Sequence, residues 1–142
     1  MKQLLVFILL SGIVCWMMFA PIYKHVVIVR HALLQQEVDY LLEIGANADH
    51  GYISPQMIEQ SKERLAAYGF SKERLVYEVS STSGRNAADA SSPVPRGEGI
   101  ALRISYPFGN LFVMDRLIGV RGPDPDERMS AWGLKMSEYV PF

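Results

Sequence analysis

Histidines and carboxylates are the side chains in this chain with the chemistry to bind a metal, and their spacing keeps them apart. His25 and His31 are six residues apart, which places them on different faces of a helix. We therefore expect packing or membrane-surface roles for them rather than a metal site. Asp124, Asp126 and Glu127 crowd one turn and have the charge to bind calcium weakly, but their spacing is not that of an EF-hand loop.

The serines and glycines do not form a catalytic or phosphate-binding set. Gly97-Glu98-Gly99 leads into an expected strand, whereas a phosphate loop leads into a helix. His50 lies in a polar turn, where we expect a solvated side chain. Several serines have no histidine or other oriented base near them in the sequence, so they indicate loop solvation rather than nucleophiles: Ser80, Ser81, Ser83, Ser91 and Ser92.

The charge of the chain argues against nucleic acid as a partner. The 142 residues carry a net charge of -1, so no basic field is present. The cations at positions 62, 64, 72 and 74 interleave with glutamates at 63 and 73, which predicts a mixed solvated face. The sequence thus predicts a non-enzymatic protein with no catalytic residue, cofactor or metal, and with no small-molecule substrate.

The N-terminal segment, residues 1–23, is expected to be a transmembrane anchor. The stretch from Leu4 to Ala20 carries no charge, and the next charged residue is Lys24. About twenty helical residues cover the roughly 30 Å hydrocarbon core of a bilayer. Trp16 and Tyr23 lie toward the far end, where aromatic rings favour the membrane interface.

A cleaved signal peptide is the alternative for this segment. The first three residues, Met1-Lys2-Gln3, carry a positive charge and an apolar run follows, as in a signal peptide. The cleavage site is poor, because Met18-Phe19-Ala20 places a large residue where a small one is needed and Pro21 would follow the cut. A lipoprotein site at Cys15 is also poor, because Ile13 and Val14 precede it. We therefore expect an anchor that stays attached.

The flanking charges and the single cysteine leave the compartment of the domain open. Lys2 and the amino terminus lie on one side of the span, and Lys24 and Arg30 lie on the other, so the positive-inside rule does not choose an orientation. Cys15 lies inside the apolar run, so the rest of the chain has no disulfide framework.

Residues 24–46 are predicted to continue the helix as an amphipathic stalk. Polar side chains occupy one side, and Gly45 or Asn47 suits the end of the helix. Pro21 either kinks the long helix or is accommodated in it. The apolar stripe is interpreted as the core face of a domain, with a coiled-coil seam as the alternative. Its members are Val27, His31, Leu34, Val38, Leu41, Leu42 and Gly45.

Residues 47–142 are predicted to form a small domain. Ser54-Pro55 suits the start of a second helix, and Gly69-Phe70 suits its end. Period-two patterns predict strands over 75–80 and 100–106, separated by a long mobile hairpin loop over 81–98.

The C-terminal part of this domain is expected to supply further sheet. Residues 110–118 are apolar and fit a short strand or a helical turn, and residues 122–126 fit a rigid turn. A last strand is predicted near the C-terminus, with Trp132, Leu134, Met136 and Val140 on its buried side. The fold class is therefore α+β: a long N-terminal helix, a second short helix and an antiparallel sheet of three to four strands.

This layout resembles the pilin-like proteins of type IV filament systems. An apolar helix runs into an amphipathic stalk, a small sheet follows, and the chain ends on the strand-like segment AWGLKMSEYV. The resemblance is closest to the TadE-like pseudopilins of tight-adherence loci and their relatives in Gram-positive bacteria. Type IV prepilins carry a glutamate five residues beyond a leader glycine, whereas Met17 stands five beyond Gly12 here. The resemblance therefore implies a minor or assembly-associated role rather than that of a major subunit.

The resemblance also implies a location and partners. The domain would lie outside the cytoplasm on a single-pass anchor in the cell membrane, or within a surface filament, beside other pilin-like or secretion-apparatus proteins. A helix that leaves lipid must be buried again by other helices, and small residues allow the closest approach. Ser11 and Gly12 are the small pair in the middle of the span, so they are the predicted helix-contact face. A membrane-anchored binding or sensory module is the alternative, and a tethered enzyme is the least favoured.

Overall fold

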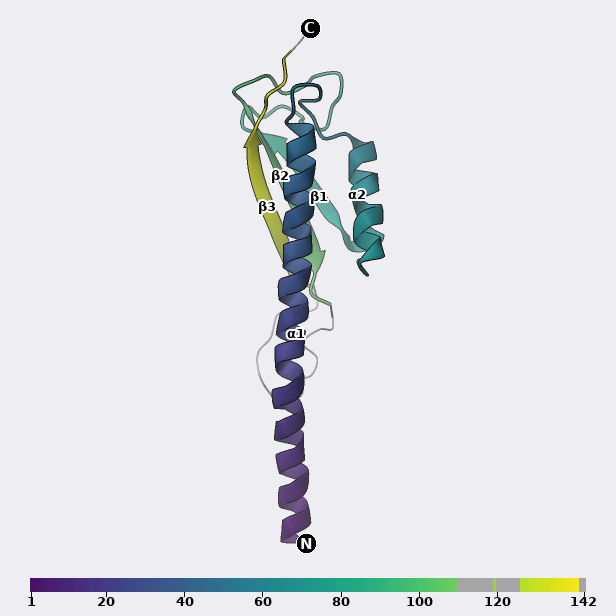
Figure 1. Cartoon of the computed structure of the whole chain (residues 1–142), viewed down its shortest axis with the longest axis vertical. Coiled ribbons are helices and arrows are strands. Elements are labelled where there is room, and N and C mark those ends of the chain that lie inside the picture. Colours follow the sequence, from purple (N-terminus) through teal and green to yellow (C-terminus); the bar gives the residue numbers. More distant parts are fainter. Residues whose placement is uncertain (110–118, 120–125, 141–142) are drawn as a thin grey trace. The chain divides into compact units, whose positions relative to one another are not determined.

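The protein has an α+β fold, described by a computed structural model for residues 1–109, 119 and 126–140. The predicted turn over 122–126 and the ambiguous segment 110–118 therefore lie largely or wholly outside the described residues. The chain divides into two compact units, Met1–Arg30 with Pro107–Glu127 and His31–Tyr106 with Arg128–Phe142. The elements in order are α1 (Lys2–Gly45), α2 (Pro55–Ala67), the 3-10 turn η1 (Lys72–Arg74), β1 (Val76–Ser81), β2 (Gly99–Pro107) and β3 (Arg128–Met136) (Figure 1).

The N-terminal part of α1 is an apolar helix with little of its surface buried. Among the described residues, α1 is the one helix that is long and apolar enough to cross a membrane. Pro21 lies inside the helix, which continues past it to Gly45. Proline removes one backbone hydrogen bond. The helix is thus not interrupted at Pro21.

From His31 onward, α1 belongs to the second unit and supplies part of its core. Most members of the predicted apolar stripe are buried: Leu34, Val38, Leu41, Leu42 and Gly45. The first two members are not, because Val27 is half-buried and His31 is exposed. The spacing of three and four residues keeps the buried members on one face of the helix. The core-face interpretation of the stripe is confirmed, since these residues pack within the unit itself.

Both ends of α2 are built as its sequence predicts. The Ser54 hydroxyl accepts a hydrogen bond from the Met57 backbone N–H at 3.3 Å, and a proline opens the helix. At the other end, Gly69 has a φ of 97°, and its N–H donates to the carbonyl of Ala66. The Phe70 N–H donates to the carbonyl of Leu65, which completes a Schellman motif and buries the Phe70 ring beneath the helix end.

The three strands form one antiparallel sheet in the order β1-β2-β3. β1 pairs with β2 from Val76 opposite Ser105 to Ser81 opposite Ile100. The predicted alternation of β2 is confirmed, because Ile100, Leu102, Ile104 and Tyr106 are buried. The two helices lie on the same face of the sheet, α1 beside β3 and α2 beside β1 (Figure 1). The core is the layer between the helices and this face.

The predicted facing of the last strand is wrong. Trp132, Leu134 and Met136 are exposed, with 54% of Trp132 open to solvent, whereas Met129 and Ala131 are buried. The reason is the close approach of α1. A Cβ atom at Gly133 would lie 2.8 Å from Leu42 Cδ1 and 2.9 Å from Val38 Cγ1, so only small residues fit there.

The long segment between β1 and β2 is held to the rest of the unit at two positions. Ala87 and Val94 are fully buried. The carbonyl of Ala87 accepts a hydrogen bond from Ile53, at 2.8 Å, and the N–H of Val94 donates to Gly51, at 2.7 Å. The buried Ser137 hydroxyl also donates to the Val94 carbonyl at 2.7 Å. The predicted mobile loop is thus corrected to a segment held at two buried points.

Candidate functional site

The histidines are dispersed over the structure and hold local contacts. His31 Nε2 lies 3.0 Å from the carbonyl oxygen of Ser130, so this nitrogen carries the proton and donates. His25 is exposed. His50 Nδ1 lies 3.0 Å from Asn47 Oδ1, and its side chain is half-buried rather than solvated as expected. Each histidine therefore stands apart from the other two.

The acidic turn gives no metal site in the part of the chain that can be described. Asp124 lies outside the described residues, and Asp126 and Glu127 are exposed. Among described residues, no group of three or more histidine, cysteine or acidic side chains is placed to hold an ion.

The loop serines bond to nearby carboxylates and carbonyls. Ser83 Oγ donates to Glu98 Oε2 at 2.6 Å, and Ser81 Oγ donates to the carbonyl of Arg85 at 3.0 Å. Ser91 donates its hydroxyl to Asp89 Oδ1 at 2.7 Å and its backbone N–H at 2.9 Å. These bonds lower the pKa of the Asp89 carboxyl. The contacts are local, as expected of side chains that stabilise a loop.

The proposed helix-contact residues lie on an open part of α1. Ser11 Oγ donates to the carbonyl of Ile8 at 2.9 Å, so its hydrogen bond is satisfied within the helix. A Cβ atom at Gly12 would meet nothing within 4 Å. Cys15 is exposed and follows these two residues by four and three positions, which places it on the same face. This face has room for a neighbouring helix.

A polar network inside the second unit joins α1, α2 and β1. Arg64 donates two hydrogen bonds to the Glu37 carboxylate, from Nε to Oε1 and from Nη2 to Oε2, both of 3.1 Å. The fully buried Ser61 hydroxyl donates to Glu37 Oε2 at 2.9 Å. Its proton is thereby used, so the Tyr77 hydroxyl donates to Ser61 Oγ, at 2.7 Å. Four side chains from three elements are thus linked, with the Glu37 carboxylate as the final acceptor.

The electrostatics of this network follow from burial and pairing. Burial raises the pKa of the Tyr77 hydroxyl to about 12, although the hydrogen bond with Ser61 acts in the opposite direction. The hydrogen bond to Glu37 raises the pKa of the Arg64 guanidinium. The guanidinium carbon also lies 4.8 Å from the centre of the Tyr40 ring, a cation–π contact. Tyr77 therefore stays protonated near neutral pH and acts as a hydrogen-bond donor.

Glu37, one of the polar side chains of α1, is largely buried instead of solvated, while Arg64 keeps part of the exposure predicted for its solvated face. Only 12% of the Glu37 side chain and 37% of the Arg64 side chain are exposed. A signal was present, because Glu37 follows Leu34 by three residues and precedes Leu41 by four, so it borders the buried stripe of α1. Its pairing with α2 depends on tertiary packing, which periodicity does not give.

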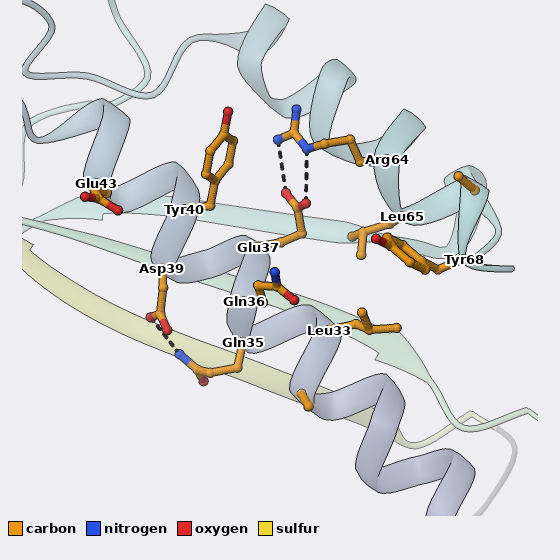
Figure 2. A pocket seen from close by; sticks show the side chains of 12 residues that line it. Leu33, Gln35, Gln36, Glu37, Asp39, Tyr40, Glu43, Arg64, Leu65 and Tyr68 are labelled. Carbon is orange, nitrogen blue, oxygen red and sulfur yellow. Dashed lines mark hydrogen bonds and ion pairs between the residues drawn. The ribbon is translucent and has the colours of Figure 1, made fainter.

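A groove lies between α1 and α2 in the second unit. It has a volume of about 990 Å³. The pair formed by Glu37 and Arg64 bridges the two helices, with Tyr40 toward one end of the groove and Leu33 and Tyr68 toward the other (Figure 2). This groove combines exposed aromatic rings with carboxylates, which makes it a candidate binding surface.

Side chains of α1 also hold the outer edge of β3. The His31 bond to the Ser130 carbonyl is followed by a bond from Gln35 Nε2 to the Trp132 carbonyl, at 3.3 Å. The two donors are four residues apart, on one face of the helix. The two acceptors are two residues apart, on one side of the strand, so each donor lies opposite its own acceptor. These hydrogen bonds occupy carbonyls of an edge strand, so the strand is less available for pairing with other chains.

The chain matches no protein family, no curated protein and no solved structure.

Proposed function

We propose that this protein is a membrane-anchored, non-enzymatic structural or assembly component of a pilus-like or secretion apparatus. In this proposal the first half of α1 spans the cell membrane once and stays attached, and the folded unit lies outside the cytoplasm. Its partners are other pilin-like or apparatus proteins in the same membrane or in a surface filament.

The observation that carries the proposal is the difference between the two parts of α1. One continuous helix has an apolar first part with little buried surface and a second part that forms the core of a small α+β unit. Apolar helical surface of this length is stable in lipid or against other apolar helices. This is the layout on which the resemblance to pilin-like proteins rests, and it supports that reading without identifying the apparatus.

Contact between helices is proposed at Ser11 and Gly12. Helices in a membrane associate through close packing, which small residues permit. The hydroxyl of Ser11 is already bonded within α1, and the space above Gly12 is open. A neighbouring helix can therefore approach this face without leaving a polar group unpaired.

The native cysteine offers a direct test. Cys15 lies on the proposed contact face, so oxidation of isolated membranes should cross-link α1 to a copy of itself, and a bifunctional maleimide should capture a partner with a nearby thiol. Gly12→Leu should leave membrane insertion intact, because leucine favours the membrane, and should reduce the yield of cross-linked product.

A matched control moves the thiol to the opposite face. In a Cys15→Ser, Met17→Cys variant the thiol stays near the same depth but points away from Ser11 and Gly12. Cross-linking should be weaker there. Equal yields at both positions, or an unchanged yield in Gly12→Leu, would contradict the contact face, and no partner at either position would favour an isolated anchor.

The proposed location outside the cytoplasm has its own test. A Cys15→Ser, Ser83→Cys variant places one thiol at an exposed loop position of the folded unit. A membrane-impermeant maleimide should label it in intact protoplasts. Labelling that requires lysis would place the unit inside the cell.

A second candidate function is a membrane-anchored binding module. The groove between α1 and α2 favours it, because its exposed tyrosines and acidic rim form a surface suited to a partner. The two candidates differ in where partners attach: along the apolar part of α1 in the first, and on the folded unit in the second.

A further inference from the structure

The groove between α1 and α2 is lined by side chains of both helices and is open to solvent. Along α1, Leu33, Gln36, Tyr40 and Glu43 recur at steps of three and four residues and line it. The ten residue steps from Leu33 to Glu43 extend over about 15 Å. Tyr68 lines the α2 side. The groove therefore has the length of about three helical turns.

Its apolar walls are open to solvent at both ends. Tyr40 is 46% exposed and Tyr68 is 67% exposed, and Leu33 lies near Tyr68 (Figure 2). Tyrosine rings supply large contact area at small conformational cost and are enriched at protein interfaces. The two rings stand on either side of the Glu37–Arg64 pair, so one elongated partner lying along the groove can touch both.

The charge of the groove is acidic once internal pairs are considered. Arg64 is the one cation among the described residues that line it, and it is bonded to Glu37. Asp39 and Glu43 remain as exposed carboxylates, Glu43 on the rim and Asp39 on its outer side toward β3, where Gln35 donates to it at 3.1 Å (Figure 2). Summed over the lining residues, three carboxylates and one guanidinium give the groove a formal charge of -2.

We propose that this groove binds an amphipathic helix of a partner protein that presents lysine or arginine beside an apolar stripe. Such a helix would lay its apolar side chains against the two tyrosines and its cations against the acidic rim. A like-with-like contact through the same groove of a second copy would bring four carboxylates together, which disfavours it. Anionic lipid headgroups and nucleic acid are disfavoured for the same electrostatic reason.

This inference goes beyond the proposed assembly role and does not depend on it. Every contact that carries it lies within the second unit, from Ala32 to Tyr68. The contact face at Ser11 and Gly12 lies in the first unit. Loss of one interaction is therefore measured independently of the other.

The test uses the full chain in nanodiscs of phosphatidylcholine and a synthetic probe. The probe is a fluorescent amphipathic helix of leucine and lysine, and its partner probe has glutamate at every lysine position. Fluorescence anisotropy, corrected with empty nanodiscs, should show the lysine helix binding at least about tenfold more tightly than the glutamate helix. Binding of the lysine helix should weaken as salt rises.

Variants localise the binding to the groove. Asp39→Asn with Glu43→Gln keeps the shape of the rim but removes its charge, and should weaken binding of the lysine helix roughly three- to tenfold. Tyr68→Ala should weaken it by a similar factor. Trp132→Ala, on the other face of the sheet, is the matched control and should leave binding unchanged, and thermal unfolding should show that all three variants remain folded.

Each of the following results would overturn the proposal. They are absence of binding up to about 1 mM lysine helix, equal binding of the two probes, unchanged binding in the rim variant, and a loss with Trp132→Ala as large as with Tyr68→Ala. Self-association that the rim variant abolishes would assign the groove to a second copy and would also overturn it.

Discussion

Removing the hydroxyl of Ser61 is the sharpest perturbation of the packing between α1, α2 and β1. The Ser61→Ala change deletes one buried oxygen that joins Glu37 to Tyr77 and adds no volume. The peptide backbone of α2 should be undisturbed, because alanine is a strong helix former. Any loss of stability should therefore report the two hydrogen bonds.

The expected magnitude follows from the two partners. A hydrogen bond to a charged group contributes about 1.5–3 kcal/mol and a neutral one about 0.5–1.5 kcal/mol. Glu37 keeps both bonds from Arg64, and 12% of its side chain is exposed, so water replaces part of the loss. We expect Ser61→Ala to lower the free energy of unfolding by about 2–3 kcal/mol.

Urea unfolding of the full chain in a mild detergent, followed by near-ultraviolet circular dichroism, measures this difference. Tyr77→Phe removes only the neutral bond and should cost about 0.5–1.5 kcal/mol. The double variant should cost about 1 kcal/mol less than the sum of the singles, because both remove the same Tyr77–Ser61 bond. A Ser61→Ala cost below about 0.5 kcal/mol, or strictly additive costs, would refute the network.

Three further predictions test the sheet and the buried tyrosine. Leu102→Ala should cost about 2–5 kcal/mol as a core truncation, whereas Trp132→Ala should cost about 1 kcal/mol or less; equal costs in urea unfolding would reject the facing of β3. Gly133→Ala should destabilise by about 1–3 kcal/mol through overpacking against α1, while Gly12→Ala, with open space around it, should leave the unit unchanged; a neutral Gly133→Ala would disprove the close approach. Because the folded-state pKa of Tyr77 is raised from 10.0 to about 12, its contribution is fully present below pH 10 and is lost as pH rises to about 12. Partial exposure limits this loss to roughly 1–2 kcal/mol, and pH-dependent unfolding of Tyr77→Phe should be flatter over that window; an identical profile would contradict it.

The helices and the central strand were predictable because their signals are local. The Ser54 cap, the Gly69 C-cap and the buried stripe of α1 each depend on residues within a few positions of one another. The alternation of β2 is clean because the helices cover one of its faces and leave the other open. The α+β class followed from these elements alone.

The facing of β3 was not predictable in the same way. Both of its faces carry apolar side chains, so period two gives two possible faces. Hydrophobicity favours the face with Trp132, but α1 lies too close to β3 for a large residue at position 133, so Gly133 meets it and Ala131 is buried on the same face. Steric fit against a distant helix decided the outcome.

The groove and its network were missed for a related reason. Glu37 and Arg64 are 27 residues apart, and each looks like an ordinary solvated charge in its own helix. Their pairing, and the exposure of Tyr40 and Tyr68 beside them, depends on how α2 packs against α1. Helical periodicity identifies which face a residue occupies but not which element covers it.

The measurement that tests the central claim most directly is the intact mass of the protein extracted from carbonate-washed membranes. A retained anchor predicts that the N-terminal peptide, including Leu4 to Ala20, is present in the membrane-bound form. A mature form that begins near residue 21 and is released by the wash would contradict the account, because the folded unit would then have no span to hold it at the membrane.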